Sequence, residues 1–460
     1  MDGRASVIDA IDWSGIFDAR PPCRKQESQM SLFWVVLVGG LAAFAGSGLA
    51  LGAALGLTGL LILQFLAGGA TFVAVDAVWN VLNSFTLSAI PLFILLGEIM
   101  LRSGVSQKIY TALSPVFQRV PGGLLHTNIA VCTLFGAVSG SSLSTAAAVG
   151  SVAYPEMTKL GYDRKMVVGS LAGGGTLGLL IPPSLSLLIY GALTETSIGR
   201  LFLAGLLPGL LFAAMFMGYI YFRCRYRPGL VRDDSSKVGR GAILLNLLSL
   251  WPFVLLILTI MGSIAFGIAT PTEAAGIGVI ATIFVGKFWG ALTLKQLVES
   301  LYAAILLYAS IAFVVIGATI LAQAVSLLGV PQAILETVRA ANLEPVTVLA
   351  AVVIIYLVLG CFFDGLSLMI MTLPIVVPLM VGLGYDGIWL GVIITVMIEI
   401  GQVTPPVGLN LSVLVSVTKE KVSLGEAAMA AMPYWLILLS GVAILTVMPQ
   451  IALLLPSKLM

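Results

Sequence analysis

Long apolar stretches follow one another along almost the whole chain, and few folds can accommodate them. They run near residues 32–67, 86–101, 124–158, 167–193, 202–222, 243–269, 272–290, 301–328, 346–382, 388–417 and 430–456. A membrane-spanning helix requires roughly 20 apolar residues. Only 10% of the 460 residues are charged, against about 25% in soluble proteins. The sequence therefore predicts an all-α polytopic membrane protein, and its net charge of +2 gives no indication of nucleic-acid binding.

Two of these stretches, 124–158 and 346–382, are too long for one span and are interrupted by small or polar residues. Backbone that leaves the helix at membrane depth must be buried in protein or line a cavity. Each stretch is therefore predicted to form a re-entrant hairpin. The stretch 32–67 is long enough for two short helices.

The basic residues predict the orientation of the spans, because cytoplasmic loops carry an excess of Lys and Arg. The linker 223–240 is the most basic segment and is placed in the cytoplasm. The opposite side receives few basic residues, namely Arg200, Arg339 and Lys458. This assignment is consistent only if both hairpins return to the side from which they enter.

The chain also resembles itself at an offset of 223 residues. PEMTKLGYD at 155–163 matches PLMVGLGYD at 378–386, and GLLIPPS at 178–184 matches GQVTPPV at 401–407. The linkers around the first hairpin are basic and those around the second are not, so the two copies are predicted to face opposite ways. Inverted repeats with discontinuous helices are typical of secondary transporters, which bind substrate and ions near the bilayer midplane.

The predicted organisation has five segments. They are a polar N-terminal extension (1–30), N-terminal scaffold helices (31–85), a first inverted repeat (86–222, with hairpin 124–158 and broken helix 167–193), a basic cytoplasmic linker with scaffold helices (223–300) and a second inverted repeat (301–456, with hairpin 346–382 and broken helix 388–417). The extension is either part of the protein or precedes a true start at Met30.

The Pro-Pro pairs of the two repeats lie inside apolar stretches, where proline removes a backbone donor and interrupts the helix. The freed carbonyls can coordinate a cation, and the new helix N-terminus can face an anion. The alternative is a kink that binds nothing. The polar side chains near these pairs and at the hairpin tips are candidates for ligands, since hydroxyl and carbonyl oxygens suit Na+. Close helix packing is the alternative for the first tip, and a tip exposed to water is the alternative for Asp364 at the second.

Isolated polar residues elsewhere carry weaker signals. Glu399 is either a proton or ion ligand or a partner across a helix interface. Glu273 is predicted to cap a helix together with a neighbouring threonine, and Glu98 to lie at the membrane interface. His126 is predicted to be an ordinary interfacial residue.

An enzyme is not expected. On one helix, His126 and Ser139 are about 20 Å apart, far beyond the reach of a base for its nucleophile. The sequence has no phosphate-binding loop of the GxxxxGK[ST] type, so an ion gradient or a separate subunit must supply the energy. A passive channel remains an alternative, although two opposed hairpins favour alternating access.

Several motifs together resemble a known family. IPLFILLGEIM, FGAVSGSSLSTAAAVG, LGLLIPPS, GLLPGLL, ATPTEAAG and EIGQVTPPVGLN occur in this order and are similar to the large membrane subunit (M, DctM-like) of tripartite ATP-independent periplasmic (TRAP) transporters. The resemblance covers about residues 31–456. It implies an elevator-type transporter in the bacterial inner membrane that takes up an organic acid, such as a dicarboxylate, keto acid or sugar acid, together with Na+. A stand-alone ion-coupled symporter of similar fold is the alternative.

The resemblance also implies partners and site residues. The partners are a small four-helix membrane subunit and a periplasmic substrate-binding protein; no cofactor is implied besides Na+ as the coupling ion. The first Na+ site would involve Ser139, Gly140, Ser141, Ser142, Gly178 and Pro182, and the second Gly360, Asp364, Gly401, Thr404 and Pro405. Substrate would lie between the tips, at Ser142, Thr145, Ser184, Asp364 and Asn410.

Overall fold

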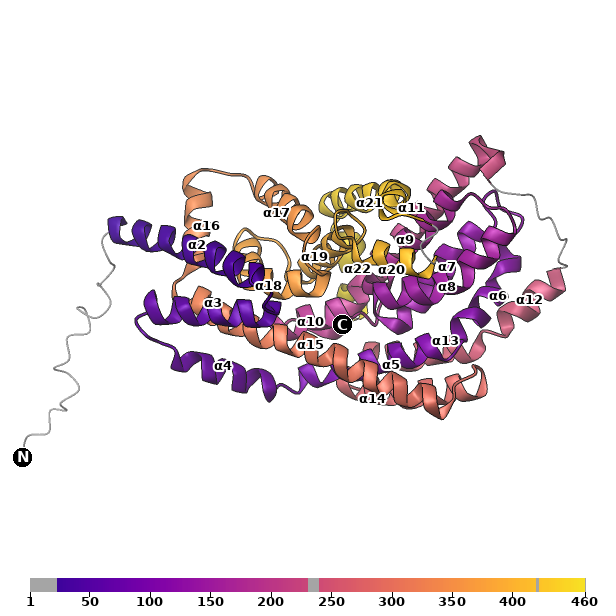
Figure 1. Cartoon of the computed structure of the whole chain (residues 1–460), viewed down its shortest axis with the longest axis horizontal. Coiled ribbons are helices and arrows are strands. Elements are labelled where there is room, and N and C mark those ends of the chain that lie inside the picture. The colour runs from indigo at the N-terminus through magenta and orange to yellow at the C-terminus, as the bar shows by residue number, and fades with distance from the viewer. Residues whose placement is uncertain (1–22, 231–239, 419–421, 460) are drawn as a thin grey trace, which may run out of the picture.

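A computed structural model describes residues 23–230, 240–418 and 422–459, and every regular element in these ranges is a helix (Figure 1). Most of the predicted extension 1–30 lies outside the described residues, as do Arg232 and Lys237 of the basic linker. Residues 23–30 belong to the first described helix, which begins at Cys23, well before the apolar stretch.

The helices before the linker are α2 (Cys23–Gly46), α3 (Leu51–Phe65), α4 (Phe72–Leu82), η2 (Thr86–Ser88), α5 (Ala89–Arg102), α6 (Val105–Phe117), α7 (Leu124–Ser139), α8 (Ser142–Lys159), α9 (Arg164–Leu180), α10 (Leu185–Leu193), α11 (Ile198–Tyr226) and η3 (Pro228–Leu230). Those after it are α12 (Arg240–Leu248), α13 (Trp251–Ala265), α14 (Pro271–Phe288), α15 (Leu294–Leu327), α16 (Val330–Ala340), α17 (Pro345–Gly360), α18 (Gly365–Gly382), α19 (Gly387–Gln402), α20 (Leu409–Val417), α21 (Leu424–Val447) and α22 (Gln450–Leu459). η2 and η3 are short 3-10 helices.

Five helices of the described chain are long and apolar enough to cross a membrane, or up to seven spans if each of two bent pairs counts as one. Five further apolar helices have only 10–17 residues, less than the roughly 20 that a single span needs. Among these are α7, α17 and α19, and each ends at a break within a longer apolar stretch. The chain is therefore a multi-pass membrane protein with several interrupted helices.

Helix starts are fixed by polar side chains that accept hydrogen bonds from free backbone N–H groups. Thr270 and Glu273 form a capping box at the start of α14, which confirms the structural role predicted for Glu273. Asp163 caps α9 and Asp386 caps α19. Because the cap sets the helix start, α9 begins at Arg164, three residues before its apolar stretch.

α3 and α15 cross at very short distance because glycines face each other there. A Cβ on Gly52 would lie 2.5 Å from the carbonyl oxygen of Phe313, and one on Gly59 would lie 2.8 Å from the backbone of Leu321. Small residues allow membrane helices to approach each other this closely, and the association of helices in lipid depends on such packing. α5 and α4 also pack along α15, so these helices form a layer that we call the α3–α15 wall.

The two hairpins lie toward opposite ends of the molecule. In Figure 1, α7 and α8 lie toward the right end, and α17 and α18 lie toward the left end. Each hairpin crosses a broken helix at a pair of glycines: a Cβ on Gly136 would lie 2.7 Å from Cα of Gly178, and one on Gly360 would lie 2.8 Å from Cα of Gly401. The same kind of crossing thus occurs in both halves of the chain.

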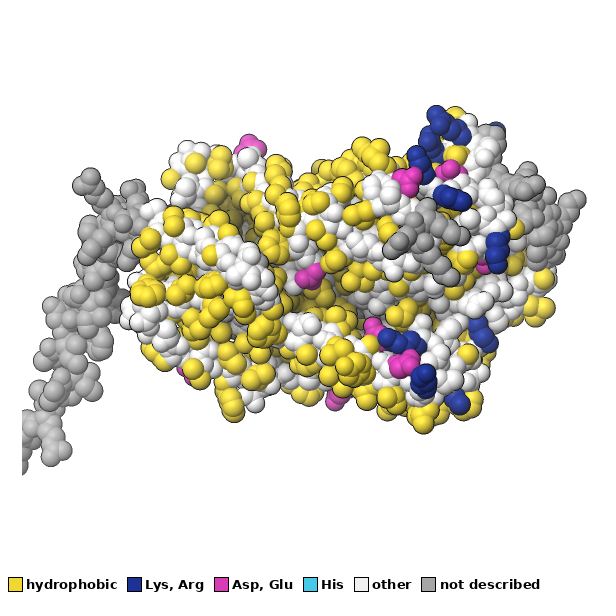
Figure 2. All heavy atoms as spheres, in the orientation of Figure 1, with side chains coloured by type: hydrophobic (Ala, Val, Ile, Leu, Met, Phe, Trp, Pro, Cys, Tyr) yellow, Lys and Arg dark blue, Asp and Glu magenta, His cyan; other side chains and the backbone are white. Residues whose placement is uncertain are grey.

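Charge is distributed unevenly along the long axis. Figure 2 shows that the Lys and Arg side chains visible on this face gather toward the right end, where α6 and α12 lie, whereas hydrophobic side chains cover much of the remainder. This is the asymmetry expected from the positive-inside rule. By this rule, the right end is predicted to face the cytoplasm.

Candidate functional site

A cavity of about 450 Å³ lies between the two hairpin breaks and the α3–α15 wall. The first break contributes Ser141, Ser142 and Leu143, and the second contributes Asp364 to Ser367. The broken helix of the second half adds Gln402 and Leu409, while residues 50–52 and 307–314 supply the wall. Residues from both halves of the chain therefore meet in one cavity.

The first break reverses the chain at Gly140, whose φ of 58° favours glycine. Ser141 then caps α8 by accepting a hydrogen bond from the backbone N–H of Ser144. Thr145 donates to the carbonyl oxygen of Ser141 at 2.8 Å, and its hydroxyl lies 2.8 Å from that of Ser139. The hydroxyls of this break are therefore held in a compact, largely buried group.

The first broken helix packs directly on this group. A Cβ on Gly178 would lie 2.6 Å from Oγ1 of Thr145 and 2.8 Å from the carbonyl oxygen of Ser141. The backbone N–H of Leu185, just after the Pro182–Pro183 break, donates to the carbonyl oxygen of Gly140 at 3.3 Å. The structure thus brings together the residues predicted for the first ion site.

The second half repeats this arrangement with different side chains. Asp364 caps α18 by accepting a hydrogen bond from the backbone N–H of Ser367 at 3.0 Å. The backbone N–H of Val407, after the Pro405–Pro406 pair, donates to the carbonyl oxygen of Cys361 at 3.3 Å. Thr404 donates to the carbonyl oxygen of Ile400 at 2.6 Å.

The residues predicted for the second ion site also lie around one break, since Gly360 contacts Gly401. The two breaks differ in exposure, however. Pro182, Pro183 and Ser184 are buried, whereas the equivalent segment from Pro405 to Val407 is exposed, as is Asp364.

A buried contact joins the two halves. Ser142 of α8 donates a hydrogen bond to Oε1 of Glu399 on α19, and both residues are 1% exposed. Of the roles left open for Glu399, the structure thus shows a contact across a helix interface. Oε2 of the same carboxylate has no partner among the described residues.

The predicted substrate residues separate into two groups. Ser142 and Asp364 line the cavity, but Thr145, Ser184 and Asn410 are absent from its lining. Thr145 is bonded within the first break, Ser184 donates to the carbonyl oxygen of Leu179, and Asn410 is fully buried. These three side chains face the protein interior because of how each helix is rotated after its break.

Sequence reasoning missed three polar residues of the cavity: Gln402, Ser367 and Ser310. Gln402 had a detectable signal, because it lies three residues after Glu399 and so shares its face of an otherwise apolar helix. Ser367 had no detectable signal in the sequence beyond its position one turn after Asp364. Ser310 lies in an apolar span whose orientation toward the cavity depends on tertiary packing.

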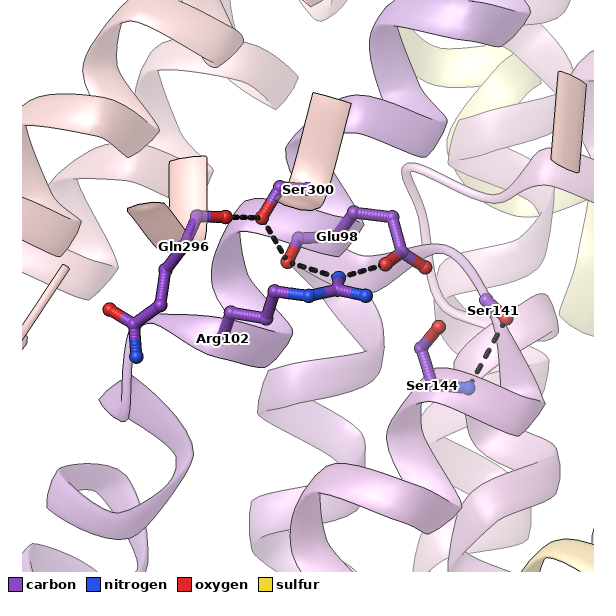
Figure 3. A network of polar contacts seen from close by, with 6 residues as sticks. All are labelled: Glu98, Arg102, Ser141, Ser144, Gln296 and Ser300. Carbon is purple, nitrogen blue, oxygen red and sulfur yellow. Dashed lines mark hydrogen bonds and ion pairs between the residues drawn. The ribbon is translucent and has the colours of Figure 1, made fainter. Parts of the chain in front are cut away.

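Glu98, which is predicted to lie at the membrane interface, takes part in a polar network (Figure 3). It forms an ion pair with Arg102 on the same helix, and its carbonyl oxygen accepts a hydrogen bond from Ser300 of α15 at 3.1 Å. The preceding residue, Gly97, packs on the first break, where a Cβ would lie 2.7 Å from the carbonyl oxygen of Ser139. The network therefore joins α5 to α15 within the wall, and the packing of Gly97 places α5 against the first hairpin.

His126 lies away from the cavity. Its ring stacks on Phe117, and its Nε2 lies 2.9 Å from the carbonyl oxygen of Pro121. It is 3% exposed and holds the start of α7 in place. No group of three or more His, Cys, Asp or Glu side chains that could bind a metal occurs in the part of the chain that the structure describes.

Comparisons with known proteins give a consistent result. Residues 38–451 match the family model described as "Tripartite ATP-independent periplasmic transporter, DctM component". The chain is 36% identical over 409 residues to the C4-dicarboxylate TRAP transporter large permease protein DctM of Pseudomonas aeruginosa, covering 88% of this chain and 94% of that protein. It is 32% identical to the sialic acid TRAP transporter large permease protein SiaM of Vibrio cholerae, covering 82% and 87%.

Among solved structures, the chain is similar to the YdaH transporter of Alcanivorax borkumensis. The TM-score is 0.59 at 15% sequence identity, and the match covers 93% of this chain and 98% of that one. At this identity the similarity concerns the fold alone.

Proposed function

The chain belongs to the DctM family, the large permease components of tripartite ATP-independent periplasmic transporters, and we propose that it imports organic acids across the bacterial inner membrane together with Na+. One observation carries the proposal: the breaks of both hairpins open into the same cavity. Breaks of this kind are where secondary transporters bind ions and substrate.

The cavity is suited to an anion. α8 begins at Ser142 and α18 begins at Gly365, and both residues line it. The N-terminus of a helix carries free N–H groups and a partial positive charge, so it attracts carboxylates. Organic acids are therefore the proposed substrates, in line with the C4-dicarboxylates and sialic acid in the names of the two relatives.

The coupling ions are proposed to bind at the two breaks. The first site is formed by Ser139 to Ser142 with Gly178 and Pro182, and the second by Gly360 and Asp364 with Gly401, Thr404 and Pro405. The compact hydroxyl group around Ser141 and Thr145 supports the first site, since oxygen ligands suit hard cations. The interrupted backbone at Thr404 and Pro405 supports the second.

Transport is proposed to follow an elevator mechanism. The hairpins and broken helices carry the cavity, and the α3–α15 wall closes it from one side. The glycine contacts between α3 and α15 hold the wall together and favour its remaining fixed while the hairpins move. The two halves are proposed to be inverted repeats with re-entrant hairpins, which the matching glycine crossings support.

Two partners are proposed, a small four-helix membrane subunit and a periplasmic protein that delivers the substrate.

The experiment reconstitutes the chain with both partners in proteoliposomes and follows uptake of a radiolabelled organic acid. Candidate acids are first selected by the shift that they cause in the melting temperature of the binding protein. An inward Na+ gradient should drive accumulation, and a sodium ionophore should abolish it. Accumulation without Na+ would refute the coupling.

Two controls separate the alternatives. Omitting the binding protein abolishes uptake in the tripartite form but not by a stand-alone symporter. Recording current across a planar bilayer distinguishes a channel, which conducts continuously down a gradient, from a carrier whose uptake saturates.

A further inference from the structure

The last turn of α19 contacts both hairpin breaks at once. Glu399 accepts a hydrogen bond from Ser142 of the first break. Gln402, one turn later, lies against the second break, where a Cβ on Gly365 would be 2.5 Å from its Nε2. One helical turn therefore connects two segments that belong to different halves of the chain.

Two buried oxygen atoms of this turn are not satisfied. Oε2 of Glu399 and Oε1 of Gln402 have no hydrogen-bond partner within the described ranges, and their residues are 1% and 6% exposed. Because the residues are three positions apart, their side chains share one face of the helix. Buried polar atoms are nearly always paired, so each unpaired one requires an explanation.

Of these two side chains, the carboxylate of Glu399 is the more costly to bury without partners. A buried carboxyl group stays charged only where it is paired or coordinates a metal, and it is otherwise protonated. In the described part of the chain, Glu399 has no ion pair and a single hydrogen bond. The N-terminus of α8 favours a nearby negative charge, but it leaves the oxygen of Gln402 without a partner. A cation would satisfy both oxygens together.

We propose that Glu399, Gln402 and Ser142 form a third cation site that takes a Na+ ion. It lies beside the first break and shares Ser142 with the first of the two proposed ion sites. All three supply oxygen, the donor that hard cations prefer. Ser142 and Gln402 also line the cavity, which gives the ion a path of entry and water molecules to complete its coordination. The ion neutralises Glu399 and ties both breaks to α19. The inference rests on the proposed Na+-coupled function.

The experiment measures equilibrium binding of radioactive Na+ to the purified full chain in lipid nanodiscs. Glu399→Gln keeps the size of the side chain and an oxygen for Ser142 but removes the charge. It should bind one Na+ fewer per protein at saturation than the wild type. Thr395→Val is the matched control, because Thr395 is also buried on α19, one turn earlier, and this variant should bind the wild-type number.

Gln402→Met provides a second measurement, since it keeps the shape but lacks the oxygen. It should bind the same number of ions, one of them about tenfold more weakly. If Glu399→Gln does not elute as a single species in gel filtration, Gln402→Met alone decides the question. A Na+ binding curve of Gln402→Met identical to that of the wild type would then overturn the third site.

The outcomes separate this inference from the function on which it rests. If the wild type and Glu399→Gln both bind two Na+, the carboxyl is not a cation ligand and the third site is refuted, while Na+ coupling at the breaks stands. If the wild type binds no Na+, the coupling fails, and the third site fails with it.

Discussion

Gly178→Ala tests whether the first break must keep its present geometry to bind an ion. Gly178 lies on α9 against the break, and the methyl group of alanine would lie 2.6 Å from Oγ1 of Thr145 and 2.8 Å from the carbonyl oxygen of Ser141. Ordinary contacts begin at 3.4 Å. The two oxygens must therefore move away by about 0.8 and 0.6 Å, which are the differences between these distances.

The magnitude follows from the cost of overpacking. Inserting a methyl group into a closely packed site costs about 1–3 kcal/mol. Without an ion, the break can shift and release this strain. With an ion bound, the carbonyl oxygen of Ser141 must stay in place, so the cost falls on the bound state. Apparent Na+ affinity should then fall by about 5- to 150-fold.

The assay is the Na+ dependence of organic-acid uptake in proteoliposomes. Gly276→Ala is the control: Gly276 lies within α14 and has no atom within 4 Å of the added Cβ position. Alanine there should leave Na+ dependence unchanged and stabilise the helix by about 0.5–1 kcal/mol. Equal Na+ dependence in Gly178→Ala and Gly276→Ala would show that the first break is not an ion site.

The remaining predictions concern single hydrogen bonds. Thr404→Ala should lower apparent Na+ affinity about fivefold by removing a ligand worth about 1 kcal/mol. Thr446→Ala is the control, because it loses the same kind of hydrogen bond within α21 and should leave Na+ affinity unchanged. Identical uptake curves for the two variants would exclude Thr404 as a ligand. Thr270→Ala removes the cap of α14 and should lower stability by about 1 kcal/mol, and an unchanged melting temperature would contradict this. Trp389→Phe leaves the buried carbonyl of Leu445 unpaired, at a cost of about 1–3 kcal/mol, visible in the same melting assay without a change in Na+ affinity.

The positions of the helix breaks could be predicted closely from the sequence. The hairpins expected at 124–158 and 346–382 correspond to helices spanning Leu124–Lys159 and Pro345–Gly382. Glycine and proline act locally on the backbone, so their effect is readable without tertiary information. Hydropathy was less informative at helix ends, because it marks the apolar part of a helix and not its cap. α2 therefore starts at Cys23, inside a polar segment.

The contacts of the site could not be predicted in the same way. Ser142 and Glu399 are 257 residues apart, and no local pattern joins them. The side chains of Thr145, Ser184 and Asn410 are close to the breaks in sequence but outside the cavity lining. Which face of a short helix points to a cavity depends on how the helix packs, and a break resets that rotation.

The unequal burial of the two breaks has a consequence for the transport cycle. The segment around Pro182 is enclosed by protein, while the one around Pro405 is exposed. An ion bound at the second break, as proposed, would lie beside exposed residues, whereas one at the first would be enclosed by buried residues. Release from the first proposed site would then require a neighbouring helix to move, whereas release from the second would not.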